Sequence, residues 1–373
     1  MKINFVGDIS LADSLNCQGY GVRTLMRRGH GDRLFDEVAP VLNGEGISYC
    51  NLETVLSTQG EDPNDLGSVD MRGEPAGIAV LNRLKLKLVN IANNHTMQHG
   101  AACFHETVEL LKRNGAEVVG LKGSDGWRCE PVVFTSEGVR CGILGYSFQH
   151  DRFHTVDLPY ACGDDAAIIG DIERLKGEVE LVIVTCHWGY EFMDHPTADQ
   201  IAAARSWVDA GAKLVVGHHP HVLQGMERYR GALIAYSLGN FMFDMLWCEE
   251  YRKTAILQVE YRDGAIHYST VPAMLDMKNR LRLLQGEKAR EFDELLSGLN
   301  DKVAREALLS DQRQGIKAYE VEYQGLINRC RVNSYWYFLK KFACYRKRFL
   351  LQQVKKTVQS HLEDFLGIFA ARG

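Results

Sequence analysis

The chain has 373 residues, of which 46% are hydrophobic and 24% are charged, and its net charge is −5. These values are ordinary for a globular protein, and the net charge does not indicate nucleic-acid binding. The length allows one large domain with an appendage, or two domains.

The beginning of the chain is a strand-like run and lacks the apolar core of a signal peptide. No later stretch is long and uncharged enough to span a bilayer. The ten cysteines include no Cys-x-x-Cys pair, and Cys141 and Cys186 lie in apolar runs, where a reduced thiol packs as a small hydrophobe. We therefore expect a thiol-reduced, cytoplasmic protein, either free or peripheral at the inner face of the membrane.

Short apolar runs alternate with helical segments as far as about residue 285, which predicts a layered α/β fold. Helices are expected over Phe104–Asn114 and over Thr197–Asp209, the second lying between Pro196 and Gly211. Short connections between residues 233 and 271 indicate an antiparallel portion. The expected strands are Ile3–Val6, Ile47–Asn51, Leu86–Ala92, Glu117–Val119, Arg140–Gly145, Leu181–Cys186, Leu214–Val216, Leu233–Tyr236, Ala255–Val259 and Ile266–Val271.

Strand signals stop beyond residue 285. We expect residues 286–373 to form a basic helical extension of a domain that comprises residues 1–285. Residues 321–373 have a net charge of +7, so the rest of the chain carries −12. Aromatic residues at spacings of three and four predict one helical face, which either packs on the main domain or contacts a membrane surface or a partner protein. These aromatics are Tyr335, Phe338, Phe342, Tyr345 and Phe349.

Side chains that are typical metal ligands follow five of the predicted strands. The run Gly217-His218-His219-Pro220-His221 places three histidines within four residues, directly after Leu214–Val216. In open α/β sheets, ligands gather outside the carboxyl ends of the strands, so the five strand ends are expected to form one site. The other four ends carry Asp8, then Asn51 and Glu53, then Asn93, Asn94 and His95, and finally His187.

This mixture of carboxylate, amide and imidazole groups suits one or two divalent transition metal ions such as Mn, Fe or Zn. A carboxylate such as Glu53 can bridge two cations, and a neutral donor such as Asn94 completes a shell without removing Lewis acidity. Two ions about 3.5–4 Å apart activate a water against a phosphoester. A free histidine beside them can protonate the leaving group.

Each of these residues also has a purely structural interpretation. Asp8 could cap a helix, the Asn93-Asn94 pair could form a turn, and His187 could be a core partner of Trp188. Gly239-Asn240 is a hairpin-turn signal. The histidine loop could be a polar surface loop.

The motifs, in this order, resemble the bacterial capsule-synthesis (poly-γ-glutamate biosynthesis, CapA-type) family of the calcineurin-like metallophosphoesterase superfamily. The resemblance covers roughly residues 1–275 and leaves the basic extension outside. The motifs are Gly7-Asp8, Asn51-Leu52-Glu53, Ala92-Asn93-Asn94-His95, His187-Trp188-Gly189-Tyr190-Glu191, Gly217-His218-His219-Pro220-His221-Val222-Leu223-Gln224 and Tyr236-Ser237-Leu238-Gly239-Asn240-Phe241.

The resemblance implies a calcineurin-like β-sandwich flanked by helices, in four layers α/β/β/α, with the metals at one edge. It implies that Asp8 and His221 hold the first metal and that Glu53 bridges. It assigns the second metal to Asn94, His187 and His219, and the catalytic role to His95. Ser10, His218, Glu191 and Asn240 are expected around this set, in contact with the ligands or with substrate.

Two positions depart from the pattern. Ser10 stands where the wider superfamily usually has a histidine, so the first metal is expected to be loosely held or absent. Gln98 stands three residues after His95, where the family commonly has Asp, and this changes what controls the tautomer of the imidazole.

The leading hypothesis is a metal-dependent hydrolase that uses a metal-activated water on a phosphoester or a γ-glutamyl-type amide. Its substrate would be a small molecule or a polymer, linked to capsule or poly-γ-glutamate-like polymer metabolism. The alternative is a non-catalytic, metal-binding accessory protein in polymer assembly or export. No nucleic-acid partner is expected, because the core is acidic and no basic, aromatic groove surrounds the motifs.

Overall fold

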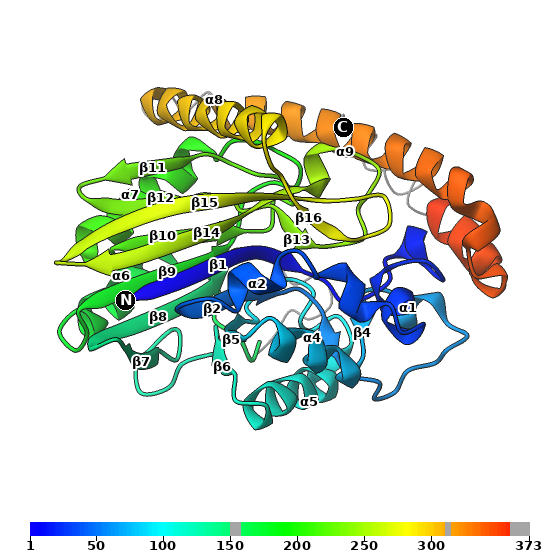
Figure 1. Cartoon of the computed structure of the whole chain (residues 1–373), viewed down its shortest axis with the longest axis horizontal. Helices are drawn as coiled ribbons and strands as arrows, with labels where there is room; N and C mark the ends of the chain where they lie inside the picture. Colours follow the sequence, from blue (N-terminus) through cyan, green and yellow to red (C-terminus); the bar gives the residue numbers. More distant parts are fainter. Residues whose placement is uncertain (150–157, 310–314, 359–373) are drawn as a thin grey trace, which may run out of the picture.

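The structure is a computed structural model that describes residues 1–149, 158–309 and 315–358. Its body consists of two facing β-sheets (Figure 1). The first sheet contains β1 (Lys2–Ile9), β2 (Ile47–Leu52), β5 (Leu86–Asn90), β6 (Glu117–Val119), β13 (Asn240–Met242), β14 (Lys253–Arg262), β15 (Ala265–Leu275) and β16 (Leu281–Leu283). The second contains β7 (Val132–Ser136), β8 (Val139–Ser147), β9 (Leu181–His187), β10 (Leu214–His218), β11 (Met226–Tyr229) and β12 (Ala232–Ala235). A small separate pair is formed by β3 (Val55–Leu56) and β4 (Arg72–Gly73).

Strand order in the first sheet is β16-β15-β14-β1-β2-β5-β6, with β13 beside β1, and in the second it is β11-β12-β10-β9-β8-β7. The strands β1, β2, β5 and β6 run parallel, as do β8, β9, β10 and β12, whereas β14, β15 and β16 are antiparallel. The expected antiparallel portion is therefore present. All ten predicted strands are confirmed, and those that the sequence did not indicate are short or lie at sheet edges.

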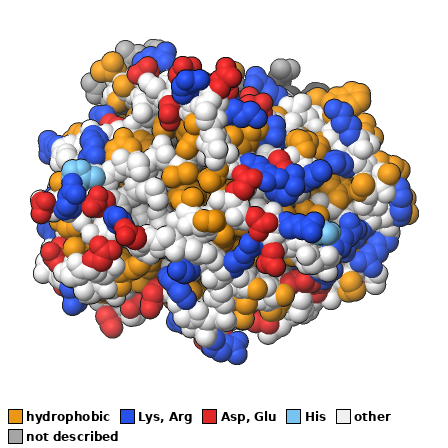
Figure 2. Space-filling view, viewed as in Figure 1, with side chains coloured by type: hydrophobic (Ala, Val, Ile, Leu, Met, Phe, Trp, Pro, Cys, Tyr) orange, Lys and Arg blue, Asp and Glu red, His pale blue; other side chains and the backbone are white. Residues whose placement is uncertain are grey.

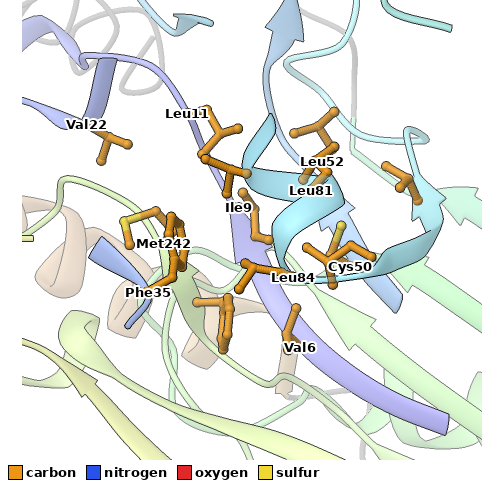
Figure 3. Close-up of a cluster of buried hydrophobic side chains, with 14 of the residues drawn as sticks. Val6, Ile9, Leu11, Val22, Phe35, Cys50, Leu52, Leu81, Leu84 and Met242 are labelled. Carbon is orange, nitrogen blue, oxygen red and sulfur yellow. The ribbon is translucent and has the colours of Figure 1, made fainter. Parts of the chain in front are cut away.

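Helices cover the outer faces of both sheets, which confirms the expected four-layer α/β/β/α sandwich with a C-terminal helical extension (Figure 1). Along β1, Phe5 points between the sheets and Val6 points outward, as strand alternation requires. The pairing of β1 is irregular around Asp8, and Ile9 also packs in the outer cluster. Figure 3 shows Ile9 and Leu52 against Leu81 and Leu84 of the covering helical layer. The helices are α1 (Val22–Arg27), α2 (Ala39–Leu42), α3 (Leu66–Val69), α4 (Ile78–Arg83), α5 (Gly100–Arg113), α6 (Asp165–Leu175), α7 (Ala198–Ala210), α8 (Glu287–Leu309) and α9 (Gly315–Lys341).

The two helices predicted in detail are present. Thr197 caps α7 in a capping box with Gln200, and Gly211 ends the helix with a φ of 139°. The helix predicted over Phe104–Asn114 is α5, which begins four residues earlier, at Gly100.

The C-terminal extension packs on the main body through its inner residues. Leu299 of α8 is buried with Leu223 and Ala255 of the body. Of the helices in the described part of the chain, none has the length and apolar character needed to cross a bilayer. The division into residues 1–285 and 286–373 stays a prediction.

One prediction about this extension is wrong. The five aromatics do not share a helical face, because α9 ends at Lys341 and Tyr345 has an extended backbone. Tyr345 and Phe349 are instead buried against Leu66 and Val69. Burial of these two rings against the body outweighs continuation of the helix.

Buried carboxylates tie together the loops that follow β1 and β13. Asp244 accepts a hydrogen bond from the backbone N–H of Ser14 at 2.9 Å, and Asp13 accepts one from Thr24 at 2.9 Å. A Cβ at Gly21 would lie 2.3 Å from Asp244 Oδ2, so only glycine fits here. Burial, together with the nearby Asp13, raises the pKa of Asp244 to about 7.

Asp244→Asn is expected to remove part of the pH dependence of stability. The pKa of Asp244 in the folded state lies above its ordinary value of 3.8. The stabilisation that protonated Asp244 gives the fold is therefore complete below pH 3.8 and is lost as the pH rises towards about 7. Between about pH 5 and about pH 8 the wild type should lose roughly 2–3 kcal/mol relative to the variant. Urea unfolding with a chelator at both pH values measures this difference. Exposed Asp32→Asn is the control, and a difference between wild type and Asp244→Asn that does not change with pH contradicts the assignment.

Candidate metal centre

Strand register brings the predicted residues to one edge of the sandwich. In the first sheet Asp8 is opposite Asn51, which is itself opposite Asn90. In the second sheet His187 is opposite His218. Asp8 therefore lies within a strand and is not a helix cap.

Two histidines of the loop after β10 have an unusual backbone conformation. His219 and His221 have φ values of 96° and 59°, in the left-handed region that residues other than glycine rarely adopt. A Cβ at Gly217 would lie 2.0 Å from the carbonyl oxygen of Tyr236, so the close approach of β10 to this segment requires glycine. Both imidazoles are buried, so the interpretation of this run as a polar surface loop is wrong.

Three donor atoms converge around His187. Its Nε2 lies 2.8 Å from Asn94 Oδ1, 3.0 Å from His219 Nδ1 and 3.5 Å from Glu53 Oε1. These are the four residues assigned to the second metal and the bridge. The other ring nitrogen of His187, Nδ1, lies 3.3 Å from Asn51 Nδ2. Trp188 instead donates to the carbonyl of Tyr236, so the two residues are not a core pair.

His221 joins the same cluster. Its Nε2 lies 3.8 Å from Glu53 Oε1, and its other ring nitrogen, Nδ1, lies 3.9 Å from Asp8 Oδ2. The possible ligand atoms of Glu53, His219 and His221 lie within 4.8 Å of one another, as do those of Asp8, Glu53 and His187. Asn240 Oδ1 is 2.9 Å from His221 Nδ1, which directs Nε2 toward Glu53. Asn240 opens β13 beside β1, opposite Asp8, so it lies next to the candidate ligands and not in a hairpin turn.

The surroundings of the Glu53 carboxylate indicate whether these residues could bind a cation. The carboxylate is fully buried, and neither oxygen has a hydrogen-bond partner among the described residues. Burial raises the pKa of Glu53 well above its usual range, and the charges of Asp8 and Glu191 add to this. A buried, unpaired carboxylate is costly, and a divalent cation bound by the surrounding imidazoles would satisfy it. The donor set therefore fits one or two divalent ions.

The histidines are in the protonation state that metal binding requires. Burial lowers the pKa of His187 well below its usual range and lowers that of His219 to about 3. Both are therefore neutral near pH 7, with lone pairs available for a metal. Burial alone would raise the pKa of Asp8. The hydrogen bond and the charge of the neighbouring His218 instead hold the pKa of Asp8 below its ordinary value.

A buried amide network behind the ligands was not predicted. Asn51 Nδ2 donates to Asp8 Oδ1 at 2.8 Å, and Asn51 Oδ1 accepts from Asn90 at 2.9 Å and from Asn93 at 3.3 Å. Asn93 also accepts from the hydroxyl of Thr96 at 2.8 Å. The signal in the sequence was an Asn at the end of two neighbouring buried strands, where an uncompensated amide would be costly.

His95 lies beside this cluster and is held by Gln98. His95 Nδ1 is 2.8 Å from Gln98 Oε1, and its Nε2 is 3.9 Å from Glu53 Oε1. Gln98 Nε2 donates to the carbonyl of Asp70 at 3.3 Å, which leaves Oε1 as the acceptor. The proton of His95 is therefore on Nδ1, and the lone pair of Nε2 faces the centre.

Gln98→Ala is expected to lower kcat by about 10–100-fold while metal content is unchanged, because the imidazole loses its orientation. Gln98→Asp should restore the rate and move the basic limb of the pH–rate profile to higher pH, since a carboxylate stabilises the protonated imidazole. Steady-state kinetics across pH measures both effects. Identical profiles for wild type and Gln98→Asp would show that Gln98 does not act through His95.

The remaining predicted residues surround the same edge. His218 Nδ1 lies 3.1 Å from Asp8 Oδ1, and its ring packs near Tyr49. Ser10 is buried just beyond β1, where its N–H donates to the carbonyl of Met242. Glu191 is partly exposed, and its charge acts on both Glu53 and His219. The individual roles of all these residues stay predictions.

Comparison with known proteins gives the family. Residues 2–245 match the family model described as bacterial capsule synthesis protein PGA_cap. The chain is 30% identical over 276 residues to the capsule biosynthesis protein CapA of Bacillus anthracis, covering 71% of this chain and 64% of that protein. It is 28% identical over 280 residues to the PGA biosynthesis protein CapA of Bacillus subtilis (strain 168), covering 73% and 71%.

Among solved structures, the chain is similar to a 5'-nucleotidase from Candida albicans SC5314, with a TM-score of 0.39 and 13% identity, over 89% of this chain and 58% of that one. The family assignment depends on the sequence matches. The matched range, residues 2–245, contains all the predicted metal ligands. The chain is a member of the bacterial capsule synthesis protein family PGA_cap.

Proposed function

We propose that this protein is a divalent-metal-dependent hydrolase that acts on a phosphoester or a γ-glutamyl-type amide in the metabolism of a capsule-like polymer. The observation that carries the proposal is the buried Glu53 carboxylate, unpaired among the described residues and 3.5–3.9 Å from imidazole nitrogens of three histidines. The printed names of the Bacillus relatives support the link to capsule and PGA biosynthesis.

The residues of the candidate metal centre would have different roles in such a reaction. Glu53, Asn94, His187 and His219 would hold one cation, and Asp8, Glu53 and His221 would hold another. Bound cations would supply a hydroxide nucleophile at neutral pH and Lewis-acid stabilisation of charge. His95 Nε2 faces the centre from its more exposed side, so His95, once protonated on Nε2 as the imidazolium, can deliver that proton to a leaving oxygen or nitrogen and return to its neutral form.

One observation supports the alternative of a non-catalytic metal-binding accessory protein. Ser10 follows Asp8 where an imidazole would complete the first shell, so the first cation would rely on Asp8, Glu53 and His221 alone. A loosely held first metal would weaken two-metal chemistry while leaving a single bound ion.

The first experiment is elemental mass spectrometry on tag-free wild type and His219→Ala, with exposed His105→Ala as the matched control. Two equivalents of Mn, Fe or Zn in the wild type and in the control, substantially lost in His219→Ala, support a binuclear site. One equivalent supports single-metal chemistry. Turnover of an activated phosphodiester and of a γ-glutamyl amide is measured on the same samples. Metal-loaded protein that turns over neither substrate class favours the accessory function, and protein that binds no metal after reconstitution contradicts both.

A further inference from the structure

The last part of the described chain is strongly basic in sequence. Residues 326–358 contain nine Lys or Arg residues and no Asp or Glu. Figure 2 shows Lys and Arg side chains, with hydrophobic side chains among them, toward the end of the molecule where α1 and the end of α9 lie. This charge differs in sign from that of the rest of the protein.

Helix α9 has apolar residues on two opposite sides. Its inner side packs on the body, where Leu326 and Cys330 contact the cluster of Phe192 and Tyr251, and Tyr337 is buried. Its outer side carries Val332, Trp336 and Leu339, which are 53%, 62% and 57% exposed. Spacings of four and three place these three on one face, away from the packed side.

The segment after α9 adds a second exposed apolar set that is fixed to the body. Tyr345 and Phe349 are buried against α3, and Gln352 Oε1 accepts from the N–H of Leu66 at 2.7 Å. On the helical residues 350–358 that follow, an exposed set recurs at spacings of three and four, each member more than half exposed: Leu351, Val354 and Val358. These anchors fix where the segment lies on the body.

We propose that the surface formed by Val332, Trp336, Leu339, Leu351, Val354 and Val358, with the Lys and Arg residues around it, docks on an anionic lipid bilayer. A Trp among aliphatic side chains, bordered by long cationic side chains, matches the headgroup region of a membrane. Anionic headgroups complement the exposed basic side chains of this segment, which include Lys340, Lys347, Arg348 and Lys355. A second copy of the chain would bring those same charges against one another, which disfavours self-association. This proposal is independent of turnover at the metal centre.

The test is co-sedimentation of the full chain with phosphatidylcholine vesicles, with and without phosphatidylglycerol. We expect binding only to the anionic vesicles, falling as salt is raised. Trp336→Ser/Leu339→Ser should weaken partitioning by about tenfold or more. Lys340→Gln/Lys355→Gln should weaken it by about fivefold for each charge removed.

Matched controls lie outside this surface. Leu308 of α8 is 82% exposed, so Leu308→Ser should bind like the wild type, as should Lys317→Gln at the start of α9. Circular dichroism and thermal melting check that each variant is folded. Absence of wild-type binding overturns the proposal, as does equal binding to neutral vesicles or equal weakening by the control variants. Loss of a dimer in Trp336→Ser/Leu339→Ser by light scattering, without lipid binding by the wild type, would identify a second copy as the occupant.

Discussion

Glu53→Gln is expected to abolish metal binding and yet to stabilise the metal-free fold. The carboxylate is completely buried and has no hydrogen-bond partner among the described residues, so without a cation it destabilises the chain. A neutral amide of the same size should raise the unfolding free energy of chelator-treated protein by about 1–3 kcal/mol. The same change removes the shared ligand, and with it several kcal/mol of charge stabilisation, so turnover should fall roughly a thousandfold.

Thermal melts with chelator, elemental analysis and kinetics on one preparation measure the three effects. Glu45→Gln is the matched control, because Glu45 is exposed and pairs with Lys2 on the surface. It should leave metal content and rate unchanged. A Glu53→Gln protein that is less stable than metal-free wild type would mean that Glu53 holds the fold together and is not kept there for a cation.

His95→Asn is expected to lower kcat by about 10²–10⁴-fold while the metal content is unchanged. The reason is its position: His95 Nε2 lies 3.9 Å from Glu53, beside the ligands and nearer to solvent than His187. If His95 protonates the leaving group, the loss of kcat should be large for an alkyl phosphoester. It should be small for a nitrophenyl phosphoester, whose leaving group needs no proton.

The comparison of the two leaving groups decides the role. His105→Asn serves as the control, because His105 is exposed on α5 and remote from the strand ends. Equal losses on both esters would assign His95 to substrate positioning. A loss of metal from His95→Asn would instead make it a ligand.

The strand ends were predictable because parallel strands deliver their last residues to one edge. Asp8, Glu53, His187 and His219 each follow an apolar run, and this order alone indicated a common site. The amides of Asn51, Asn90 and Asn93 were harder to interpret, since a buried Asn becomes meaningful only when its neighbours in the sheet are known. Strand pairing across 39 residues puts Asn90 against Asn51, which local sequence cannot show.

The C-terminal prediction failed for a related reason. Spacings of three and four describe a helix that is long enough to continue, but they do not indicate where a distant loop offers a better contact. Leu66 and Val69 bury Tyr345 and Phe349, and the chain leaves the helical path to reach them. Tertiary burial of two aromatic rings is worth more than a few residues of helix propensity.

The candidate ligands come from both sheets. Asp8, Glu53 and Asn94 lie at or just after the ends of strands of one sheet, and His187, His219 and His221 lie at or just after the ends of strands of the other. Neither sheet alone supplies a complete shell. A cation can therefore bind tightly only after the two halves of the sandwich have assembled, and an intermediate with one finished sheet should have little affinity for it. The rate of metal uptake during refolding would therefore report when the two sheets come together. A bound ion, with ligands from both sheets, would slow their separation.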